Sequence, residues 1–454
     1  MYGRTLNALR RASDIVTAPF ERGLFGAGIR LRHVLVSTTS IAGTLAVTAG
    51  LGFLFWVIAA RLFTPAAVGT ASAAISAMLL LGSVGTFGMG ALLVRELARS
   101  PGHERALIAW ALGVATGLGL IAGLAFAIVA PSVDQELRSL EGPVVTAIFV
   151  AGVCLASLSI VYDQAFIGLL RAELQFLRNL VFALLKIGLV AALFLIAGGG
   201  DWLAIYIAWG ASIALSLLAI TVVAAVRRAI PPSHPHERIR ILRLGPSAAS
   251  HFALNVTLQV PTLGMPILVA ATAGAEVNAS FYIAWLVAGA AAMIPISLSS
   301  TLYAIGSRAP DALRHQVRLT LGLSFIAALA ATVVLAVAGD LVLGIFGAHY
   351  ASSATALTLF AAANIPTVVK NHFHVLLRIE GRVARAAFAC GIGALLELSL
   401  ASVGLRLGGV TGLAIGWFAA LSLEALVLAP VVYRVAKRGL LILPAASGIL
   451  RPAD

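Results

Sequence analysis

The sequence predicts an all-α, polytopic membrane protein of about 12 transmembrane helices in two six-helix lobes, related by a pseudo-two-fold axis along the membrane normal. Three observations predict this fold: the apolar composition, the placement of the basic residues and an internal repeat. Of the 454 residues, 60% are apolar and 11% are charged, and the mean hydropathy is +1.02. Soluble domains are only about 45–50% apolar. We therefore expect lipid around most of the surface and no room for a soluble catalytic domain.

Apolar runs long enough to cross a membrane, about 20 residues, recur along the chain. The first six predicted spans are 34–60, 68–93, 107–130, 144–170, 180–197 and 202–226. The second six are 246–271, 279–305, 319–338, 353–377, 386–405 and 410–432. We expect them to form an N-lobe (34–228) and a C-lobe (246–433), with three cytoplasmic segments: a basic N-terminal segment (1–33), an interlobe linker (229–245) and a tail (434–454).

The lysines and arginines fall almost entirely on one side of the predicted spans. If the N-terminus is cytoplasmic, that side has 26 of them and the other side has three, Arg61, Arg138 and Arg406, while Lys186 and Lys370 lie within spans. This bias follows the positive-inside rule at every connection, so we expect a multi-pass protein with both termini in the cytoplasm. The same placement explains the net charge of +13 without nucleic acid as a partner.

A repeat relates the two halves of the chain. Residues 163–173 read DQAFIGLLRAE and residues 370–380 read KNHFHVLLRIE, with five identities at an offset of 207. The same shift carries the start of the first span close to the start of the seventh. Each half then contributes six helices in the same orientation, which is the parallel duplication seen in many transporters.

Ionisable side chains within the predicted spans need a partner or a function, because burying a charge in hydrocarbon costs about 2.5–3.5 kcal/mol on insertion scales. We expect Asp163 to pair with Lys186 in the N-lobe, and Lys370 with Glu397 in the C-lobe. The alternative is that at least one of these faces the path of the substrate or of a coupling ion. Glu424 has no evident partner, so it is either a proton carrier or cation ligand, or is hydrogen-bonded to a group that the sequence does not reveal.

Three polar side chains, His251, Asn255 and Gln259, recur at intervals of four in the seventh span and so share one helix face. They should avoid lipid, and they either line the central cavity, where they would contact sugar hydroxyls, or hydrogen-bond across a helix interface. Pro261 and Pro266 follow in the same span. Because proline removes a backbone hydrogen bond, we expect a bent helix there, either a gating hinge or a static kink.

Basic side chains gather where several predicted spans end on the cytoplasmic side. Arg171 and Arg378 are related by the repeat, Lys370 lies a little deeper, and Arg95 is at the end of the second span. Guanidinium groups in this position would hold a diphosphate. The alternative is that they only orient the chain in the membrane.

The remaining motifs predict neither catalysis nor a metal site. His372 and His374 have no third ligand at a convincing spacing, so we expect a packed pair. Cys154 and Cys390 lie inside apolar runs, as small core residues do. The sequence has no Walker loop, dinucleotide fingerprint or nucleophile elbow, and we expect neither an enzyme nor a bound cofactor.

Four local patterns connect the chain to a known family. They are AARLFTPAAVGTASAA at 59–74, GALLVRELAR at 90–99, FYIAW at 281–285 and LLRIEGRVAR at 376–385. With these patterns, 12 predicted spans and duplicated lobes, the chain resembles the polysaccharide and oligosaccharide (Wzx-type) flippases of the multidrug/oligosaccharidyl-lipid/polysaccharide exporter superfamily.

The resemblance implies a flippase that moves a polyprenyl-diphosphate-linked oligosaccharide from the cytoplasmic to the outer leaflet of a bacterial inner membrane by alternating access. It would serve cell-surface or exopolysaccharide biosynthesis, with membrane lipids and a polysaccharide polymerase or export machinery as partners. A Na+ or H+ gradient, or the membrane potential, would drive it. Such proteins often have a cationic cavity, whereas here the lysines Lys186 and Lys370 are offset by three carboxylates, Asp163, Glu397 and Glu424. The cytoplasmic arginines are therefore better candidates for the diphosphate.

Other functions remain open at this point. A cation-coupled exporter of small amphipathic drugs would have the same fold and would depend on an unpaired carboxylate such as Glu424. A membrane glycan polymerase or ligase would need an outward catalytic region, but the longest outward connection is only 131–143. An inactive scaffold for polysaccharide machinery is a further alternative.

Overall fold

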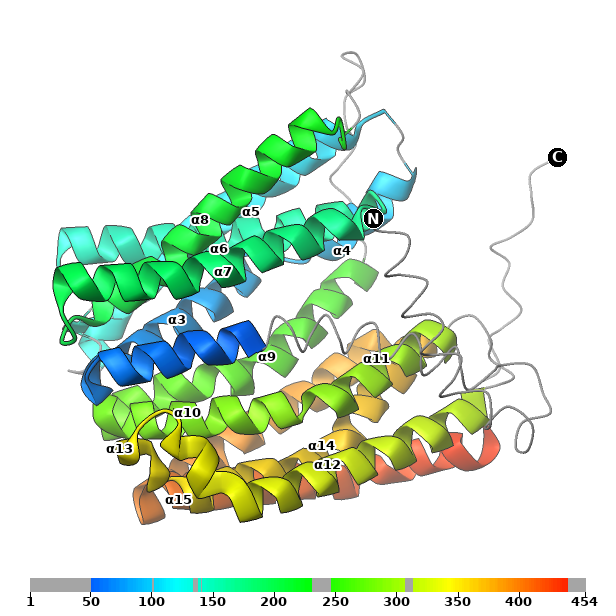
Figure 1. Cartoon of the computed structure of the whole chain (residues 1–454). Coiled ribbons are helices and arrows are strands. Elements are labelled where there is room, and N and C mark those ends of the chain that lie inside the picture. The colour runs from blue at the N-terminus through cyan, green and yellow to red at the C-terminus, as the bar shows by residue number, and fades with distance from the viewer. Residues whose placement is uncertain are drawn as a thin grey trace, which may run out of the picture.

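The computed structural model describes residues 50–99, 102–133, 138–139, 141–230, 246–306 and 313–439, and these residues form helices joined by short turns (Figure 1). The predicted basic N-terminal segment (1–33), nearly all of the predicted interlobe linker and most of the predicted tail lie outside the described residues. The fold described below is therefore that of the predicted membrane-spanning region.

The first half of the chain forms a helix over Gly50–Leu62 followed by α3 to α8. Their bounds are α3 Pro65–Gly85, α4 Met89–Arg99, α5 Glu104–Val133, α6 Pro143–Gly168, α7 Ala172–Ala197 and α8 Trp202–Val226. Local signals set several ends. Thr64 caps α3 with Pro65 in its first turn, and Asp201 caps α8 by accepting from the Leu203 amide at 2.8 Å. Positive φ at Phe87 and Gly88 ends α3 and divides the second predicted span into α3 and α4.

The second half of the chain forms α9 to α15. Their bounds are α9 Pro246–Ala273, α10 Ala275–Ala291, α11 Met293–Gly306, α12 Leu313–Gly344, α13 Ala348–Ala351, α14 Ala354–Ile379 and α15 Val383–Arg438. The axis bends by 45° between α10 and α11. The helix α15 contains two spans, separated at Gly408 and Gly409, where φ at Gly409 is +59°. Glycine permits this left-handed backbone, so the chain can turn back there.

The described helices correspond in order to the 12 predicted spans. Eight helices are long and apolar enough to cross a membrane, and the bent pair α10 and α11 is a ninth candidate. The other three are the helix Gly50–Leu62, the second half of α15, and α14, which is 26 residues long but rich in polar side chains. The predicted all-α membrane fold is thus confirmed.

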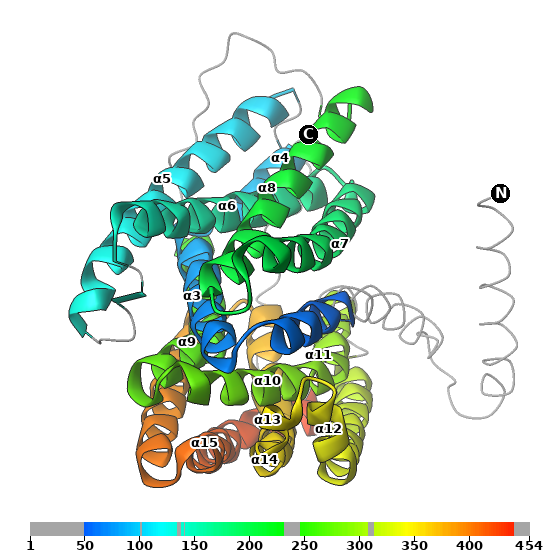
Figure 2. The ribbon, with the colours of Figure 1, turned by 60° about the vertical axis from the view of Figure 1, so that its left-hand side comes forward.

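The helices form two groups, which Figure 2 shows one above the other: α4 to α8 in the first half of the chain and α9 to α15 in the second. The helix Gly50–Leu62 and α3 lie between them. We call the end of the bundle that carries the α4–α5, α6–α7 and α14–α15 turns the basic end, and the opposite end the far end. In Figure 1 the two groups converge at the far end and diverge at the basic end.

The hydrophobic core follows the same division. Near the far end, a single cluster of buried side chains joins the lobes and includes Trp56 and Ile75 of the first half with Met265, Phe281 and Phe360 of the second. Near the basic end, the two halves have separate clusters. One contains Leu93, Leu107 and Val161, and the other contains Leu254, Val317 and Phe373. The lobes therefore share a core at the far end and have separate cores at the basic end, where Phe87 and Phe252 make a contact between them with ring centroids 5.1 Å apart.

Polar contacts reinforce the junction at the far end. The Asn278 side chain of α10 donates to the Gly69 carbonyl of α3 at 2.8 Å and to the Ser72 hydroxyl at 3.1 Å. Arg61 donates to the carbonyls of Gly344 and Ile345, each at 2.8 Å. The two backbones approach so closely that a Cβ at Gly69 would overlap the Ala275 carbonyl. We call these contacts of Arg61, Gly69 and Asn278 the far-end seal.

The far-end seal predicts the effect of Gly69→Ala. The added methyl cannot fit beside the Ala275 backbone, and overpacking of this kind costs about 1–3 kcal/mol. We expect the variant to populate a state with the lobes separated at the far end. Spin labels on the exposed residues Gly200 and Ala348, one on each lobe, should then report a longer distance by electron paramagnetic resonance.

The measurement is made with Cys154 and Cys390 replaced by alanine, since both thiols are free. Gly113→Ala in α5 is the matched control, because a Cβ there meets nothing within 4 Å. An unchanged distance distribution in Gly69→Ala would contradict the role of the seal.

Candidate functional site

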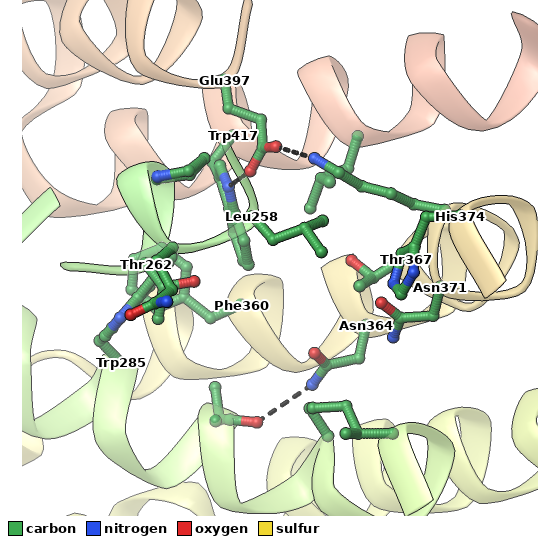
Figure 3. A pocket seen from close by; sticks show the side chains of 18 of the residues that line it. Leu258, Thr262, Trp285, Phe360, Asn364, Thr367, Asn371, His374, Glu397 and Trp417 are labelled. Carbon is green, nitrogen blue, oxygen red and sulfur yellow. Dashed lines mark hydrogen bonds and ion pairs between the residues drawn. The ribbon is translucent and has the colours of Figure 1, made fainter. Parts of the chain in front are cut away.

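The C-lobe contains an open cavity of about 490 Å³ that residues of α9, α10, α11, α14 and α15 line (Figure 3). Its apolar walls include Trp285, Phe360 and Trp417. The polar side chains that line it are Asn255, Gln259, Thr262, Asn364, Thr367, Lys370, Asn371, His374, Arg378 and Glu397. Its volume is in the range of small-molecule sites, and its lining combines aromatic faces with hydrogen-bonding groups.

Three buried charges form a cluster at one wall of this cavity. The Lys370 ammonium of α14 pairs with Glu397, which lies in the first half of α15, and lies 3.0 Å from the Glu424 carboxylate of the second half. All three side chains are at most 7% exposed. Trp417 donates its indole N–H to Glu397 at 2.6 Å. One lysine thus ties together α14 and both halves of α15.

The predicted pair of Lys370 with Glu397 is confirmed, and the structure supplies the partner of Glu424 that the sequence did not reveal, which is the same lysine. The cluster contains two carboxylates and one ammonium, so it carries a surplus negative charge when all three are ionised. Apart from Lys370, 3.0 Å from one oxygen, no hydrogen-bond donor to the Glu424 carboxylate is found among the described residues. A proton or a monovalent cation at Glu424 would remove that surplus.

The predicted pair of Asp163 with Lys186 is wrong. Asp163 instead accepts two hydrogen bonds from Arg178, each 2.6 Å long, and a third from Asn179 at 3.3 Å. The reason lies in where α7 begins. The sequence placed the span from residue 180, whereas the helix starts at Ala172, so Arg178 lies on the helix near the end of α6 and reaches Asp163 first.

Lys186 has an aromatic environment in place of an acid. Its ammonium lies 4.4 Å from the ring centroid of Trp209, 4.9 Å from that of Phe182 and 5.4 Å from that of Phe55. The side chain is 4% exposed, and no ion pair to it is found among the residues that the structure describes. Cation–π attraction to three rings therefore stabilises this charge.

The polar stripe of the seventh predicted span lies on α9. Asn255 and Gln259 line the cavity, and Asn255 accepts a hydrogen bond from Arg378 at 2.7 Å. His251 lies one turn closer to the basic end and does not line the cavity. The helix α9 continues through both Pro261 and Pro266, so their role as a hinge stays a prediction.

Of the four basic residues proposed for a diphosphate, Lys370 and Arg378 line the same cavity. Arg378 lines the cavity, whereas Arg171 is exposed at the α6–α7 turn and lies 3.5 Å from Glu173. Arg95 belongs to α4, but its side chain is not among the described ones. Arg378 is therefore the guanidinium that the structure places at the cavity.

The two histidines point in different directions. His372 packs against α12, with its ring nitrogens 2.8 Å from the Val368 carbonyl and 3.2 Å from the Thr320 hydroxyl. His374 lines the cavity. Within the described part of the chain, no group of three or more His, Cys, Asp or Glu side chains could hold a metal ion.

Two features of the site were missed at the level of sequence. The first is a stripe on α14, Asn364, Thr367, Asn371, His374 and Arg378, whose spacings of three and four put all five on the cavity face. That spacing is visible in the sequence and could have predicted the stripe. The second is an aromatic cavity of about 270 Å³ between the lobes. It could not be predicted from the sequence, because its lining residues come together only in the tertiary structure.

The interlobe cavity adjoins the C-lobe cavity. Trp56 and Trp209 of the N-lobe and Tyr282 of the C-lobe line it, and Thr262 and Trp285 line both cavities. A molecule held in the C-lobe cavity would therefore also face the aromatic side chains of the N-lobe.

The chain resembles known proteins in family and in fold. Residues 34–246 match the family model described as "Polysaccharide biosynthesis protein". No curated protein matches the sequence. Among solved structures, the inward-facing conformation of a multidrug resistance MATE family transporter of the MOP superfamily aligns with a TM-score of 0.61 and 18% identity, over 88% of this chain and 98% of that one.

Two further solved structures have a similar fold. The outward-facing conformation of a multidrug resistance MATE family transporter gives a TM-score of 0.59 at 16% identity, over 89% of this chain and 96% of that chain. A MOP superfamily transporter from Pyrococcus furiosus Vc1 (DSM3638), described by the reverse polarity of its binding pocket, gives 0.61 at 15% identity with the same two shares.

These findings define the class of protein. The chain is a multi-pass membrane protein with the two-lobe fold of MOP superfamily transporters. Its first lobe matches the polysaccharide biosynthesis family, which confirms the predicted resemblance.

Replacing each of the two buried lysines with methionine should change the stability of the protein differently. Lys370→Met leaves Glu397 and Glu424 buried without a cation, and breaking a buried pair in this way costs about 3–5 kcal/mol. Lys186→Met removes a buried charge for which the described residues supply aromatic rings and no acid, so we expect no loss of stability or a gain. Thermal unfolding in detergent measures both. Equal losses of Tm in the two variants would contradict this account of the cluster.

Proposed function

We propose that the protein is a flippase that moves a polyprenyl-diphosphate-linked oligosaccharide from the cytoplasmic to the outer leaflet, by alternating access of its two lobes, for cell-surface or exopolysaccharide biosynthesis. The observation that carries this proposal is the C-lobe cavity, which amides, tryptophans and one arginine line together. The match of the first lobe to polysaccharide biosynthesis proteins supports it.

The cavity lining suits a sugar. Sugar rings present apolar faces that pack against aromatic side chains, and Trp285 and Trp417 supply such faces. Sugar hydroxyls both donate and accept hydrogen bonds, as do the amides Asn255, Gln259 and Asn371. The volume of about 490 Å³ accommodates a few sugar units of a longer oligosaccharide.

Arg378 is the proposed partner of the diphosphate. Its Nε is buried and has no hydrogen-bond partner among the described residues, while its Nη2 donates to Asn255. A guanidinium can bind a phosphate through two parallel hydrogen bonds. Lys370 is the weaker candidate, because two carboxylates already neutralise it. Arg95 and Arg171 remain proposed contacts nearer the membrane surface.

The packing of the lobes supports entry of the substrate from the basic end, which we propose faces the cytoplasm. The far-end seal and the shared core close the far side, while the lobes have separate cores on the basic side. The protein would then lie in a bacterial inner membrane with both termini in the cytoplasm, beside the polysaccharide polymerase or export machinery.

We propose that the surplus negative charge at Glu424 couples transport to a Na+ or H+ gradient or to the membrane potential. The cluster of Lys370, Glu397 and Glu424 holds α14 and both halves of α15 together, so a cation or proton there would alter the wall of the cavity. Asp163 and Arg178 form a balanced pair and are the weaker candidates for coupling. Such a transporter breaks no covalent bond of its substrate and is not an enzyme.

A second candidate function is the export of small amphipathic drugs coupled to a cation. The interlobe cavity, of about 270 Å³, favours this function, because Trp56, Trp209 and Tyr282 give it an aromatic lining. The fold is the same for both functions, so only a transport measurement separates them.

The test is the leaflet exposure of a labelled polyprenyl-diphosphate oligosaccharide in vesicles that contain the purified protein. We expect protein-dependent movement of the lipid, slowed about tenfold or more by Arg378→Ala, because a charge-assisted phosphate contact is lost. Glu424→Gln should instead remove the dependence on an ion gradient. Arg406→Ala, an exposed arginine in α15 at the far end, is the matched control.

One outcome would overturn the proposed function, and a second would overturn the role of Arg378. The labelled lipid could stay in its leaflet while a cationic dye is exported under an ion gradient, and the drug-exporter function would then hold. Arg378→Ala could also leave the movement of the lipid unchanged, and the diphosphate would then bind elsewhere.

A further inference from the structure

A second basic site lies outside the proposed substrate path. At the basic end of the C-lobe, a groove of about 460 Å³ opens between α14 and the two halves of α15. Arg382 and Arg385 come from the start of α15, and Arg434 comes from near its end. We call the groove formed by these three residues, Phe388 and Val427 the arginine groove.

The arginine groove opens on the outer surface of the lobe. Phe388 is 73% exposed and Val427 is 75% exposed. Further exposed apolar residues follow on the same faces of both halves of α15, with Ile392 and Leu395 after Phe388, and Leu423 one turn before Val427. In a membrane this apolar strip contacts acyl chains, so the groove lies where the lipid tails meet the headgroup region.

The groove is separate from the C-lobe cavity. The two lie on different faces of α14: Asn371, His374 and Arg378 line the cavity, while Phe373 and Leu377 line the groove. Ligands of the two sites would therefore not compete for the same side chains.

The groove has a surplus of positive charge. None of the described residues that line it is acidic. Arg382 lies 3.5 Å from Glu380, and Arg434 uses its Nε to donate to the Pro430 carbonyl at 3.1 Å. Arg385 makes no side-chain hydrogen bond or ion pair with the residues that the structure describes. Among the described residues, the Arg385 guanidinium and the Nη groups of Arg434 have no partner and can bind an anion.

We propose that the arginine groove binds the phosphate of an anionic phospholipid of the bilayer, whose acyl chains lie along the apolar strip of α15. Guanidinium groups suit phosphate because they donate paired hydrogen bonds in one plane. Basic pockets between membrane helices at the cytoplasmic surface recognise anionic headgroups on the same basis. A lipid bound there joins the end of α14 to both halves of α15, which are the elements that Lys370 links deeper in the lobe.

The test compares lipids of identical acyl chains bound to the delipidated protein in detergent. Phosphatidylglycerol should raise Tm and remain bound in native mass spectrometry, whereas phosphatidylcholine and inorganic phosphate should do so much less. The double variant Arg385→Gln and Arg434→Gln should bind phosphatidylglycerol about tenfold or more weakly, because charge-assisted contacts are lost. The far-end pair Arg138→Gln and Arg406→Gln makes the same change in charge and should bind as the parent does.

A second variant keeps the proposal testable if the glutamine variant does not fold. Arg385→Lys with Arg434→Lys retains the charge but loses the paired donors, so its binding should be intermediate. Equal binding of phosphatidylglycerol by the parent and the glutamine variant would overturn the proposal. So would equal stabilisation by inorganic phosphate, which would indicate a site for a free anion, or displacement by a polyprenyl diphosphate alone, which would indicate a landing site for the substrate.

Discussion

The interaction on which the C-lobe depends is the buried ion cluster of Lys370, Glu397 and Glu424. Hydrocarbon cannot solvate a charge, so each buried ion has to find its partner within the protein. In the cluster, a carboxylate from each half of α15 contacts the one ammonium of α14. These contacts fix one wall of the polar cavity. The N-lobe solves the same problem differently, with a balanced pair of Asp163 and Arg178 and with Lys186 among aromatic rings.

Much of this fold could be predicted from the sequence, because membrane helices obey simple constraints. Length, hydropathy and the placement of arginines determined the spans, and the repeat of 163–173 in 370–380 determined the two lobes. The pair of Lys370 with Glu397 could be predicted because both charges lie well inside apolar spans and need a partner there. The cavity face of α9 could be anticipated as well, because Asn255 and Gln259 are poor neighbours for lipid.

The errors have physical reasons. The fifth span was expected to begin at residue 180, but α7 begins at Ala172, so Arg178 displaces Lys186 as the partner of Asp163. The aromatic surroundings of Lys186 come from three helices, and no local pattern brings Phe55, Phe182 and Trp209 together. The same holds for Glu424, whose partner lies 54 residues away in another helix. Such contacts depend on helix rotation, which apolar sequences determine poorly.

The measurement that tests the central claim most directly is photo-crosslinking of a polyprenyl-diphosphate oligosaccharide with a diazirine on its sugar, followed by mass spectrometric mapping. The account predicts crosslinks on the cavity faces of α9 and α14, between Asn255 and Gln259 and between Asn364 and Arg378. Crosslinks confined to Trp56 and Trp209 of the interlobe cavity, with none on α14, would contradict the assignment of the C-lobe cavity to the sugar.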